Sequence, residues 1–436
     1  MEETVSGTRI AALLGRLEGE LRTLRDGEKF SNKSRISAGN LVFVCTARSI
    51  ANRYISVVDE MAQRFPSRAF FVAVEGAPTG MRSSADSSTR LDLLGEGAAV
   101  RILSAQQLEA QDDEGPRSMM GLAGDSAPPP SMENAADAGP NVDVDGRVYA
   151  IETDADGLSD RVDIRGPRAF ARHLASAVDA LVLPELPVIL VWVGAARADD
   201  GVFQAFNDDT KRVITDSAYA GLDSLLSIFQ WTQEADTRPR LSDLAWVRLG
   251  PWQELTARFF DDDRSPLLDV LDRIEISHAA ADVGFQPPDC ALFTAWIANR
   301  LGATLERDSF GYIATQKNGR RFPITVTPVP RPKGVAPGTL ASVRFLAKNS
   351  EFTAQIKRDL GTGRGDQTAD ADLLHWHIAD GVTVLEQTIR LHSHKVSYWL
   401  DRTVRRPDEE PLFVAVLKTL LAMDAAQDRA QESLRG

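Results

Sequence analysis

Leu41-Val-Phe-Val-Cys-Thr46 and Ala69-Phe-Phe-Val-Ala-Val74 are the two continuous apolar runs that decide the fold of this chain. Their length and their content of β-branched and aromatic residues are typical of strands buried on both faces. Between them, residues 48–65 repeat apolar side chains at helical spacing, and Pro66 ends the helix that this spacing predicts. A strand, a helix and a second strand with short joins form a βαβ unit, so we expect the two strands to run parallel.

The same alternation continues toward the middle of the chain. Strands are predicted at 98–104, 147–152, 161–165, 187–193, 211–216 and 273–277, and helices at 167–183, 202–208, 222–232 and 289–301. This order predicts an α/β fold with a doubly wound, mostly parallel sheet, Rossmann-like in its layers. Residues 242–262 are interpreted as two helical pieces that break at Gly250-Pro251.

An amphipathic helix is predicted at the amino terminus, within residues 1–30. Leucine and isoleucine side chains between residues 7 and 26 recur on one helical face. Docking of that face on its own domain is the ordinary role of such a helix, and binding of a partner is the alternative.

A segment of different composition interrupts the predicted α/β domain, which covers residues 31–275. Residues 106–142 are rich in Pro, Asp, Ala, Gly and Ser and contain no aromatic side chain. Such a composition buries too little apolar surface to offset its chain entropy. We therefore expect a disordered insertion there, because loops of this length are uncommon inside a compact domain.

The carboxyl-terminal part, residues 276–436, changes to a period of two residues after Gly302, which is typical of strands with one buried face. Two such runs, 310–317 and 320–327, flank Asn318-Gly319, a strong hairpin signal. This pattern predicts an α+β domain with an antiparallel sheet. Further strands are predicted at 341–347, 351–358, 373–378 and 382–391, and a closing helix at 411–425.

The charge balance and the cysteine count exclude several classes of function. The 436 residues carry 49 basic and 62 acidic side chains, a formal net charge of −13. That balance argues against a general nucleic-acid binder and against docking on an anionic membrane. Two cysteines cannot form a disulfide framework, and their scarcity suits a reducing cytosol. With an acidic start, no targeting segment and no apolar run long enough to span a bilayer, a soluble cytoplasmic protein is expected.

No nucleotide or hydrolase fingerprint occurs in the chain. The sequence contains neither G-x-x-x-x-G-K-[ST] nor G-x-S-x-G, and no G-x-G-x-x-G lies between a predicted strand and a helix. The run Gly361-Thr-Gly-Arg-Gly365 is interpreted as a flexible loop. No cofactor is therefore expected, and the α/β layer is predicted to keep the form of a nucleotide-binding fold without its site.

The cysteines and two histidine pairs are the other candidates for chemistry. Cys45 ends a predicted buried strand, and Cys290 begins a predicted helix, where the pKa of a thiol can be lowered. Core packing is the favoured role of both cysteines, and redox sensing is the alternative. His375-Trp-His377 and His392-Ser-His394 could place four imidazoles on adjacent strands, a geometry that zinc accepts. No dense cluster of cysteines or carboxylates accompanies them, so ordinary strand residues are favoured and no metal site is predicted.

A basic stretch in the carboxyl-terminal part contrasts with the acidic average. Residues 300–364 carry twelve basic and four acidic side chains, and Lys317, Arg320 and Arg321 surround the predicted hairpin. A solvated sheet face is the ordinary explanation of such charges. The sharper hypothesis is a docking face for an acidic protein or a phosphorylated ligand.

Tryptophan and arginine gather in a second unusual segment. Trp246, Arg248 and Trp252 fall within seven residues, with Arg240 and Arg258 on either side. Both residue types are enriched at binding hot spots, although two tryptophans at helical spacing more often belong to a core.

Several segments of the chain match one family pattern in order. They read S-R-I-S-A-G-N-L-V-F-V at 34–44, R-F-P-S-R at 64–68, L-P-E-L-P-V-I-L-V-W-V-G at 183–194, K-R-V-I-T-D-S at 211–217, and D-L-A-W-V-R-L-G-P-W-Q-E-L-T-A-R-F-F-D at 243–261. Together they resemble the bacterial OpcA family of glucose-6-phosphate dehydrogenase assembly proteins. Val193 and Gln253 depart from that pattern, which has Trp and Arg at these positions.

The resemblance implies a non-catalytic protein that binds glucose-6-phosphate dehydrogenase, promotes its active oligomer as an allosteric activator and supports NADPH production in the oxidative pentose phosphate pathway. The partner surface would then include Arg248, Trp252 and their neighbours or the basic residues around Arg320. The alternative is a phosphosugar- or nucleotide-binding enzyme or sensor that uses residues 300–364 as its anion site. Redox control through Cys45 or Cys290 is a third hypothesis, and the chain's own oligomeric state stays open.

Overall fold

The computed structural model describes residues 2–26, 37–46, 48–75, 102–104, 144–154, 157–208, 210–235, 239–279, 287–332, 335–347, 352–360, 373–381, 383–391, 395–406 and 410–435. The segment predicted as a disordered insertion, 106–142, lies outside the described residues, and so do the glycine run 361–365 and the pair His392 and His394. In the described part of the chain, no helix combines the length and the apolarity needed to cross a membrane.

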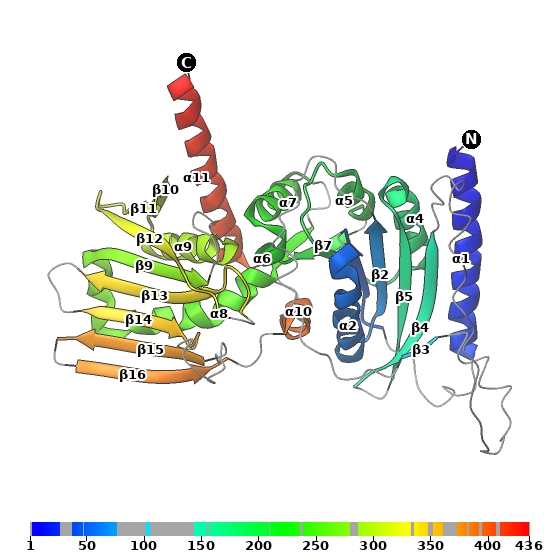
Figure 1. Cartoon of the computed structure of the whole chain (residues 1–436), viewed down its shortest axis with the longest axis horizontal. Coiled ribbons are helices and arrows are strands. Elements are labelled where there is room, and N and C mark those ends of the chain that lie inside the picture. The colour runs from blue at the N-terminus through cyan, green and yellow to red at the C-terminus, as the bar shows by residue number, and fades with distance from the viewer. Residues whose placement is uncertain are drawn as a thin grey trace, which may run out of the picture.

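The strands form two eight-stranded sheets, which we call sheet A and sheet B (Figure 1). Sheet A has the order β3-β4-β5-β2-β1-β6-β7-β8, and its strands from β5 to β8 run parallel. The predicted βαβ unit is confirmed, because β1 pairs in parallel with β2. The strands are β1 (Asn40–Cys45), β2 (Arg68–Glu75), β3 (Ile102–Ser104), β4 (Asp145–Glu152), β5 (Leu158–Pro167), β6 (Val188–Val193), β7 (Thr210–Thr215) and β8 (Arg240–Asp243).

Helices cover both faces of sheet A, which explains the continuous apolar runs. On β1, Leu41 and Phe43 pack into one hydrophobic cluster, while Val42 and Val44 pack into the other, because successive side chains of a strand point to opposite faces. The first cluster includes α2 (Arg48–Arg64) and α10 (Val396–Val404). The second cluster includes α1 (Glu2–Asp26), α4 (Ala171–Leu181), α5 (Gly201–Phe206) and α7 (Leu222–Glu234).

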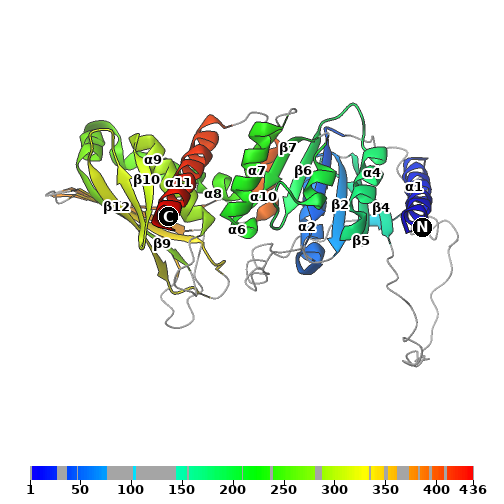
Figure 2. The ribbon, with the colours of Figure 1, turned by 90° about the horizontal axis from the view of Figure 1, so that it is seen from above.

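The amino-terminal helix α1 docks on its own sheet. Leu13 and Leu17 are buried, and Glu20 accepts a hydrogen bond from the backbone N–H of Val148 at 3.1 Å. Both views place α1 beside β4 and α4, at the end of the molecule opposite sheet B (Figures 1 and 2). The apolar face that the sequence predicts is therefore occupied within the chain.

Sheet B has the order β10-β11-β12-β9-β13-β14-β15-β16. The sheet is mixed rather than antiparallel as predicted, because β9 and β12 pair in parallel in its middle. The chain leaves β9 through α9 (Pro288–Leu301) and returns through two hairpins, so β12 lies beside β9 and runs in the same direction. The strands are β9 (Leu271–Ala279), β10 (Thr304–Asp308), β11 (Gly311–Thr315), β12 (Arg321–Val329), β13 (Leu340–Ala347), β14 (Thr353–Arg358), β15 (Leu373–Asp380) and β16 (Thr383–Arg390).

Helix α8 (Leu244–Ala257) passes through Gly250-Pro251 without a break, so the prediction of two helical pieces is wrong. Pro251 lacks an N–H, and one backbone hydrogen bond of the helix is lost there. Leu249 before the proline and Trp252 after it are both buried in the same cluster. The packing of both halves against one core offsets the lost bond.

The last part of the chain connects the two sheets. Helix α10 packs against α2, and the hydroxyl of Ser397 donates a hydrogen bond to Glu60. Helix α11 (Pro411–Arg435) returns to α9 and β10. A segment that follows all strands of sheet B therefore belongs to the packing of sheet A, which the local sequence pattern does not predict.

Candidate functional site

Two adjacent parallel strands of sheet A end in carboxylates. Asp243 is the last residue of β8, and Asp216 directly follows β7. Asp243 caps α8 by accepting the backbone N–H of Trp246 at 3.0 Å, and it also accepts the Ser217 hydroxyl at 2.9 Å and the Ser217 N–H at 2.6 Å. It therefore joins the start of α8 to α6 (Ser217–Ala220).

Arg248 completes this network from the second turn of α8. Its guanidinium makes two hydrogen bonds to the carboxylate of Asp216, at 2.9 and 2.6 Å. Asp216 also caps α6 by accepting the N–H of Ala218 at 3.2 Å. Burial by itself lowers the pKa of Arg248, but the charge and the hydrogen bonds of Asp216 outweigh it and raise that pKa above its usual range.

The network carries perturbed acids as well as this ion pair. Burial raises the pKa of Asp243 to about 7, the charge of Asp216 adds to the rise, and the hydrogen bonds from Ser217 and Trp246 oppose it. Burial also raises the pKa of Tyr54 on α2 well above its usual value, with a further rise from Asp216. The hydroxyl of Tyr54 therefore belongs to the same buried environment.

These side chains occupy the edge of sheet A where ligands of open α/β sheets usually bind, at the carboxyl ends of the strands. Both Asp243 oxygens and both Asp216 oxygens accept hydrogen bonds from the chain itself. Cys45, which ends β1, is buried at the same edge. These hydrogen bonds hold α6 and α8 against the ends of β7 and β8, so the network has a structural role.

The sequence interpretation did not single out Asp216, Ser217 or Asp243 as site residues. The available signal was an aspartate that ends the predicted strand 211–216 and another at the start of the segment 242–262, which is predicted to be helical. Strand β8, which Asp243 ends, was not predicted. The segments that contain these aspartates, 211–217 and 243–261, carry the family resemblance, and the structure brings them into direct contact.

The two tryptophans predicted for a partner surface are buried. Trp246 is 3% exposed and Trp252 is 1% exposed. Trp246 stacks on Phe413 at 5.3 Å and donates its indole N–H to Glu410 at 2.9 Å. A buried indole cannot contact a partner while the chain keeps this fold, so core packing explains both positions better than a binding role.

The arginines near those tryptophans separate to different parts of the molecule. Arg240 is exposed on β8 of sheet A. Arg258 lies against sheet B, over the ring of Trp376 at 5.4 Å, and donates a hydrogen bond to Gln387 at 2.9 Å. Together with the half-buried Arg248, they do not form one surface cluster.

The predicted hairpin is confirmed, with Thr315 opposite Arg321 and with Gly319 at a positive φ of 83°. Its basic side chains largely contact the chain itself. Arg321 pairs with Glu306 at 2.8 Å, Arg320 donates to the carbonyl of Asp269, and the Lys317 side chain lies against Gly302, which ends α9. Lysine at a helix carboxyl terminus is favourable for the helix dipole.

Other described cations of the basic stretch lie elsewhere on sheet B, and Arg300 lies on α9. Arg344 contacts Glu275 at 3.4 Å in the middle of the sheet, and Lys357 and Arg358 lie at the end of β14. The hairpin and the end of β14 are separated by the length of a strand, roughly 25 Å. The described charges therefore do not converge on one anion site, which weakens the alternative of a phosphosugar or nucleotide site there.

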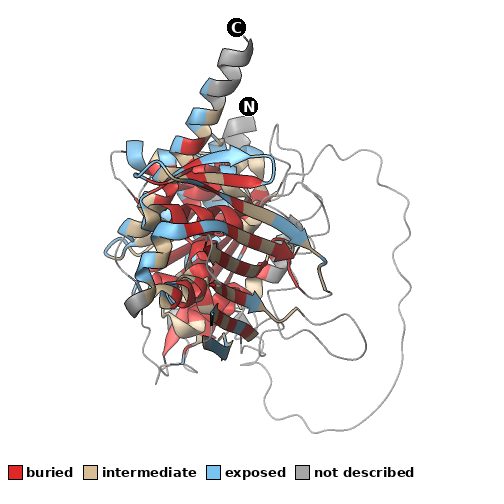
Figure 3. Ribbon diagram, turned by 90° about the vertical axis from the view of Figure 1, so that its left-hand side faces the viewer, coloured by how far each residue is buried: buried red, intermediate tan, exposed pale blue. Residues whose placement is uncertain are grey.

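Sheet B has one face packed on helices and one polar face. Along β9, Ile274, Ile276 and His278 are buried, while Arg273 is exposed and Glu275 is half-buried. Figure 3 shows the same alternation of buried and less buried residues along the strands. The polar face consequently offers charged and hydroxyl side chains to solvent.

Neither cysteine forms a disulfide, and both are 1% exposed. They lie in different hydrophobic clusters, Cys45 with α2 and Cys290 with the helices beside sheet B. Burial and the neighbouring Asp289 raise the pKa of Cys290 well above its usual value. A helix start would have lowered this pKa, but burial dominates, and a buried thiol of high pKa reacts slowly.

The described histidine pair lies on β15 with its neighbours on β16. His375 contacts the hydroxyl of Thr388 at 3.2 Å, and His377 lies 3.7 Å from Glu386. Among the described residues, no group of three or more side chains could hold a metal ion. His375 and His377 are therefore placed as cross-strand partners on an exposed part of the sheet.

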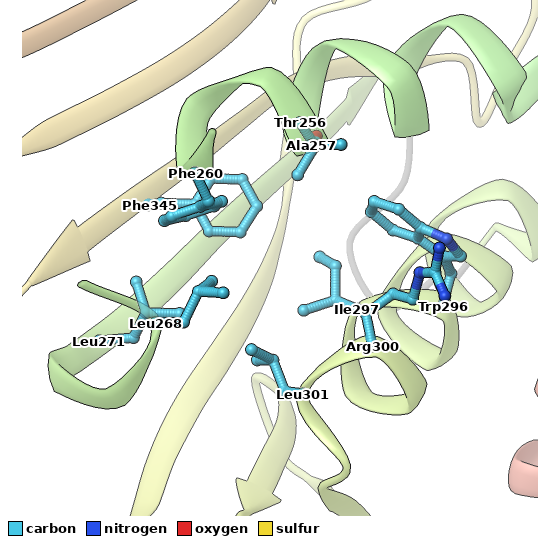
Figure 4. A pocket seen from close by; sticks show the side chains of 10 residues that line it. All are labelled: Thr256, Ala257, Phe260, Leu268, Leu271, Trp296, Ile297, Arg300, Leu301 and Phe345. Carbon is cyan, nitrogen blue, oxygen red and sulfur yellow. The ribbon is translucent and has the colours of Figure 1, made fainter. Parts of the chain in front are cut away.

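A cavity of about 210 Å³ lies where η4 (Arg258–Phe260), η5 (Asp262–Val270), α9 and β13 meet (Figure 4). Its lining is largely apolar, and Arg300 is its one charged residue. The lining residues are Thr256, Ala257, Phe260, Leu268, Leu271, Trp296, Ile297, Arg300, Leu301 and Phe345. A phosphorylated substrate needs several convergent polar groups, which this lining does not supply.

Two models of one family match the chain. A glucose-6-phosphate dehydrogenase subunit N-terminal domain, OpcA_G6PD_assem, matches residues 130–228, and the C-terminal domain, OpcA_G6PD_C, matches residues 239–417. Together these two matches cover well over half of the chain.

Curated relatives carry the same family name. A putative OxPP cycle protein OpcA of Synechococcus elongatus is 32% identical over 143 residues, which is 32% of this chain and 31% of that protein. Another, from Nostoc punctiforme, is 25% identical over 263 residues, which is 58% of this chain and 54% of that protein. The aligned parts thus span about a third to a half of the relatives' lengths.

Solved structures resemble the chain only distantly. A 3-ketoreductase from Actinomadura kijaniata, in complex with TDP-benzene and NADP, is 8% identical with a TM-score of 0.44, over 89% of this chain and 96% of that one. Likeness at this level carries no argument about function. The matches to both domain models and to the curated relatives agree with the family resemblance of the sequence: the chain belongs to the OpcA family of glucose-6-phosphate dehydrogenase assembly proteins.

Proposed function

We propose that this chain is a non-catalytic assembly factor that binds glucose-6-phosphate dehydrogenase, promotes its active oligomer and so supports NADPH production in the oxidative pentose phosphate pathway. The observation that carries the proposal is that both domains of the OpcA glucose-6-phosphate dehydrogenase subunit family match within one chain. The relatives are named for the oxidative pentose phosphate cycle as well.

The buried network at the edge of sheet A supports the non-catalytic part of the proposal. We interpret sheet A as a Rossmann-like layer in which Asp216, Asp243 and Arg248 lie at the carboxyl ends of β7 and β8, on the edge where ligands of such sheets bind. Their oxygens and guanidinium bind one another and the starts of two helices. These groups are consequently committed to holding the fold.

Activation of the dehydrogenase follows from differential binding. A protein that binds the active oligomer more tightly than the inactive form shifts the population toward the active oligomer. A hundredfold preference corresponds to about 2.7 kcal/mol, which lies within the usual range of allosteric coupling. The chain needs no catalytic group for this effect.

We place the dehydrogenase-binding surface on the β11–β12 hairpin and the adjoining polar face of sheet B. Among the residues considered for binding, Lys317 and Arg321 are exposed there, whereas the tryptophans are buried. Exposed cations at an interface act mainly on the association rate and on specificity. An acidic surface of the dehydrogenase is the matching partner.

The test combines purified dehydrogenase with the full chain and measures co-elution and dehydrogenase kinetics. We expect co-elution, together with a higher kcat or a lower KM of the dehydrogenase. A Lys317→Glu/Arg321→Glu double variant should associate at least tenfold more slowly at low salt. Arg172→Glu, an exposed arginine on α4, is the matched control and should associate like the unmodified chain. Absence of co-elution combined with unchanged kinetics would contradict the proposed function.

A further inference from the structure

Strand β16 is the outer strand of sheet B. Exposed side chains lie on both of its faces, and Ile389 is half-buried against the core. Val384 is 58% exposed and Leu385 is 43% exposed, although the two point to opposite faces of the sheet. The other edge strand, β10, is packed against α11. Among the described residues, none pairs with the outer side of β16, which lies at the margin of the molecule in Figure 1.

The hydrogen-bond pattern of the sheet identifies which backbone groups point outward. The N–H of Asp359 donates to the carbonyl of Leu373 at 2.9 Å, so Leu373 directs its backbone groups toward β14. Alternate residues of a strand bond to opposite neighbours, so Trp376 bonds toward β16, where its partner is Gln387. The even-numbered residues of β16 therefore point their N–H and C=O groups away from the sheet, and these are Val384, Glu386, Thr388 and Arg390.

An unpaired edge with exposed apolar side chains is a template for another strand. Natural edge strands are usually short or carry lysine, proline or a bulge. By contrast, β16 has eight residues and pairs with β15 without a register shift. The outer edge of β16 therefore lacks these protective features and is suited to pair with another strand.

We propose that β16 pairs antiparallel with β16 of a second copy of this chain, around a two-fold axis at Gln387, so that two B sheets join into one. In an antiparallel ladder, outward-bonding residues must face outward-bonding residues, so the axis passes through a residue. With the axis at Gln387, Glu386 and Thr388 of the two copies form hydrogen-bonded pairs, and Leu385 faces Ile389 of the second copy.

This register is self-complementary along the strand. It pairs residues 384–390 in full, it places no like charges directly opposite each other, and it forms the Leu385–Ile389 pair twice by symmetry. Cross-strand apolar pairs contribute about 0.2–1 kcal/mol each. A two-fold axis creates each contact twice, which is the usual form of homodimer interfaces.

The neighbouring registers are less favourable. An axis at Glu386 would set two carboxylates directly opposite each other, which is destabilising. An axis at Thr388 would pair Glu386 with Arg390, but it would shorten the ladder to residues 386–390 and leave Val384 and Leu385 outside it. The Gln387 axis is the register that uses the whole exposed strand.

A cysteine scan of the full chain tests the register. In the proposed dimer, Gln387→Cys faces its own copy at a non-hydrogen-bonded pair, where Cα atoms are about 4.5 Å apart, so mild oxidation should produce a covalent dimer. Thr388→Cys is the matched control, since Thr388 is also exposed but faces Glu386 of the second copy and should not crosslink. Background reaction is low because both native cysteines are buried.

The mass in solution tests the pairing itself. Sedimentation should show the unmodified chain at twice its mass of 47.6 kDa, with dissociation on dilution. Thr388→Pro removes an outward N–H and leaves the backbone bonds to β15 in place. It should raise the dimer dissociation constant at least tenfold, with an unchanged melting temperature at a dilution where both chains are monomeric.

Three outcomes would overturn the proposal. The first is a chain that stays at single-chain mass at about 100 µM with no Gln387→Cys crosslink. The second is a crosslink through Thr388→Cys, which would overturn the register. The third is a chain that is monomeric and whose Thr388→Pro variant no longer binds the dehydrogenase. A strand of that enzyme would then pair with β16 in place of a second copy.

Discussion

Replacement of Arg248 by methionine separates a structural role of this arginine from a binding role. Methionine keeps the length and the apolar stem of the side chain, and it removes both hydrogen bonds to Asp216. The Asp216 side chain is 6% exposed, and that of Arg248 is 22% exposed. The substitution therefore leaves a carboxylate buried without its counter-charge.

The magnitude follows from that burial. Removal of one partner of a fully buried ion pair costs about 3–5 kcal/mol of unfolding free energy. Partial exposure of Arg248 lets water reach the site, so we expect a loss of about 2–4 kcal/mol. The remaining carboxylates, Asp216 and Asp243, would then be adjacent with no neutralising cation, so the variant should lose further stability as the pH rises toward neutrality.

Urea unfolding followed by tryptophan fluorescence measures the effect, because Trp246 and Trp252 report from the same helix. A double-mutant cycle with Asp216→Asn isolates the pair, and the double variant should cost about 1–3 kcal/mol less than the sum of the single variants. Arg172→Met, on the exposed side of α4, is the control and should change stability by about 0.5 kcal/mol or less.

A stable Arg248→Met variant would refute the structural interpretation. If its unfolding midpoint equals that of the unmodified chain while dehydrogenase binding is lost, Arg248 acts at the partner surface, as the sequence hypothesis had it. If both properties are unchanged, the ion pair contributes to neither.

Two further predictions concern titration and thiol reactivity. The pKa of Asp243 is about 7 in the folded chain and above its usual value, so its contribution to stability is present at low pH and is lost as the pH rises toward 7. Asp243→Asn should flatten this part of the stability profile between pH 4 and 7, measured by urea unfolding against the unmodified chain, and an unchanged slope would contradict the assignment. Cys290 should react with a thiol reagent at the rate of unfolding, because it is 1% exposed and burial raises its pKa. Rapid labelling of the native chain at neutral pH would instead support redox sensing at this residue.

Most strands and helices of the described chain follow from local patterns in the sequence. The runs at β1 and β2 are apolar at every position because both faces of sheet A are covered, and the hairpin at Asn318-Gly319 follows from the turn geometry that glycine permits. Prediction from periodicity fails where packing between distant segments decides the structure. Helix α8 continues through Pro251 for this reason, and β12 lies parallel to β9 because α9 carries the chain across the sheet.

The candidate site was predictable in residue type but not in arrangement. Trp246, Arg248 and Trp252 were predicted as part of a partner surface. The tryptophans are buried and Arg248 is paired with Asp216, because helical spacing alone does not tell which face of α8 meets a core. The aspartates that complete the network, Asp216 and Asp243, stand 27 positions apart, and only the parallel pairing of β7 with β8 brings them together.

The sequence by itself determined the family, the parallel α/β layer and the strand-rich carboxyl-terminal part, because these depend on local periodicity and on short ordered motifs. Only the tertiary structure decided which charges are buried, which are paired and which strand is outermost among the described strands of sheet B. Ion pairs such as that of Arg248 with Asp216, and the outward-facing backbone groups of β16, arise from the arrangement of strands and helices that are distant in sequence. The burial of a charge and the pairing of a strand depend on the packing of the whole chain, so no local sequence pattern predicts them.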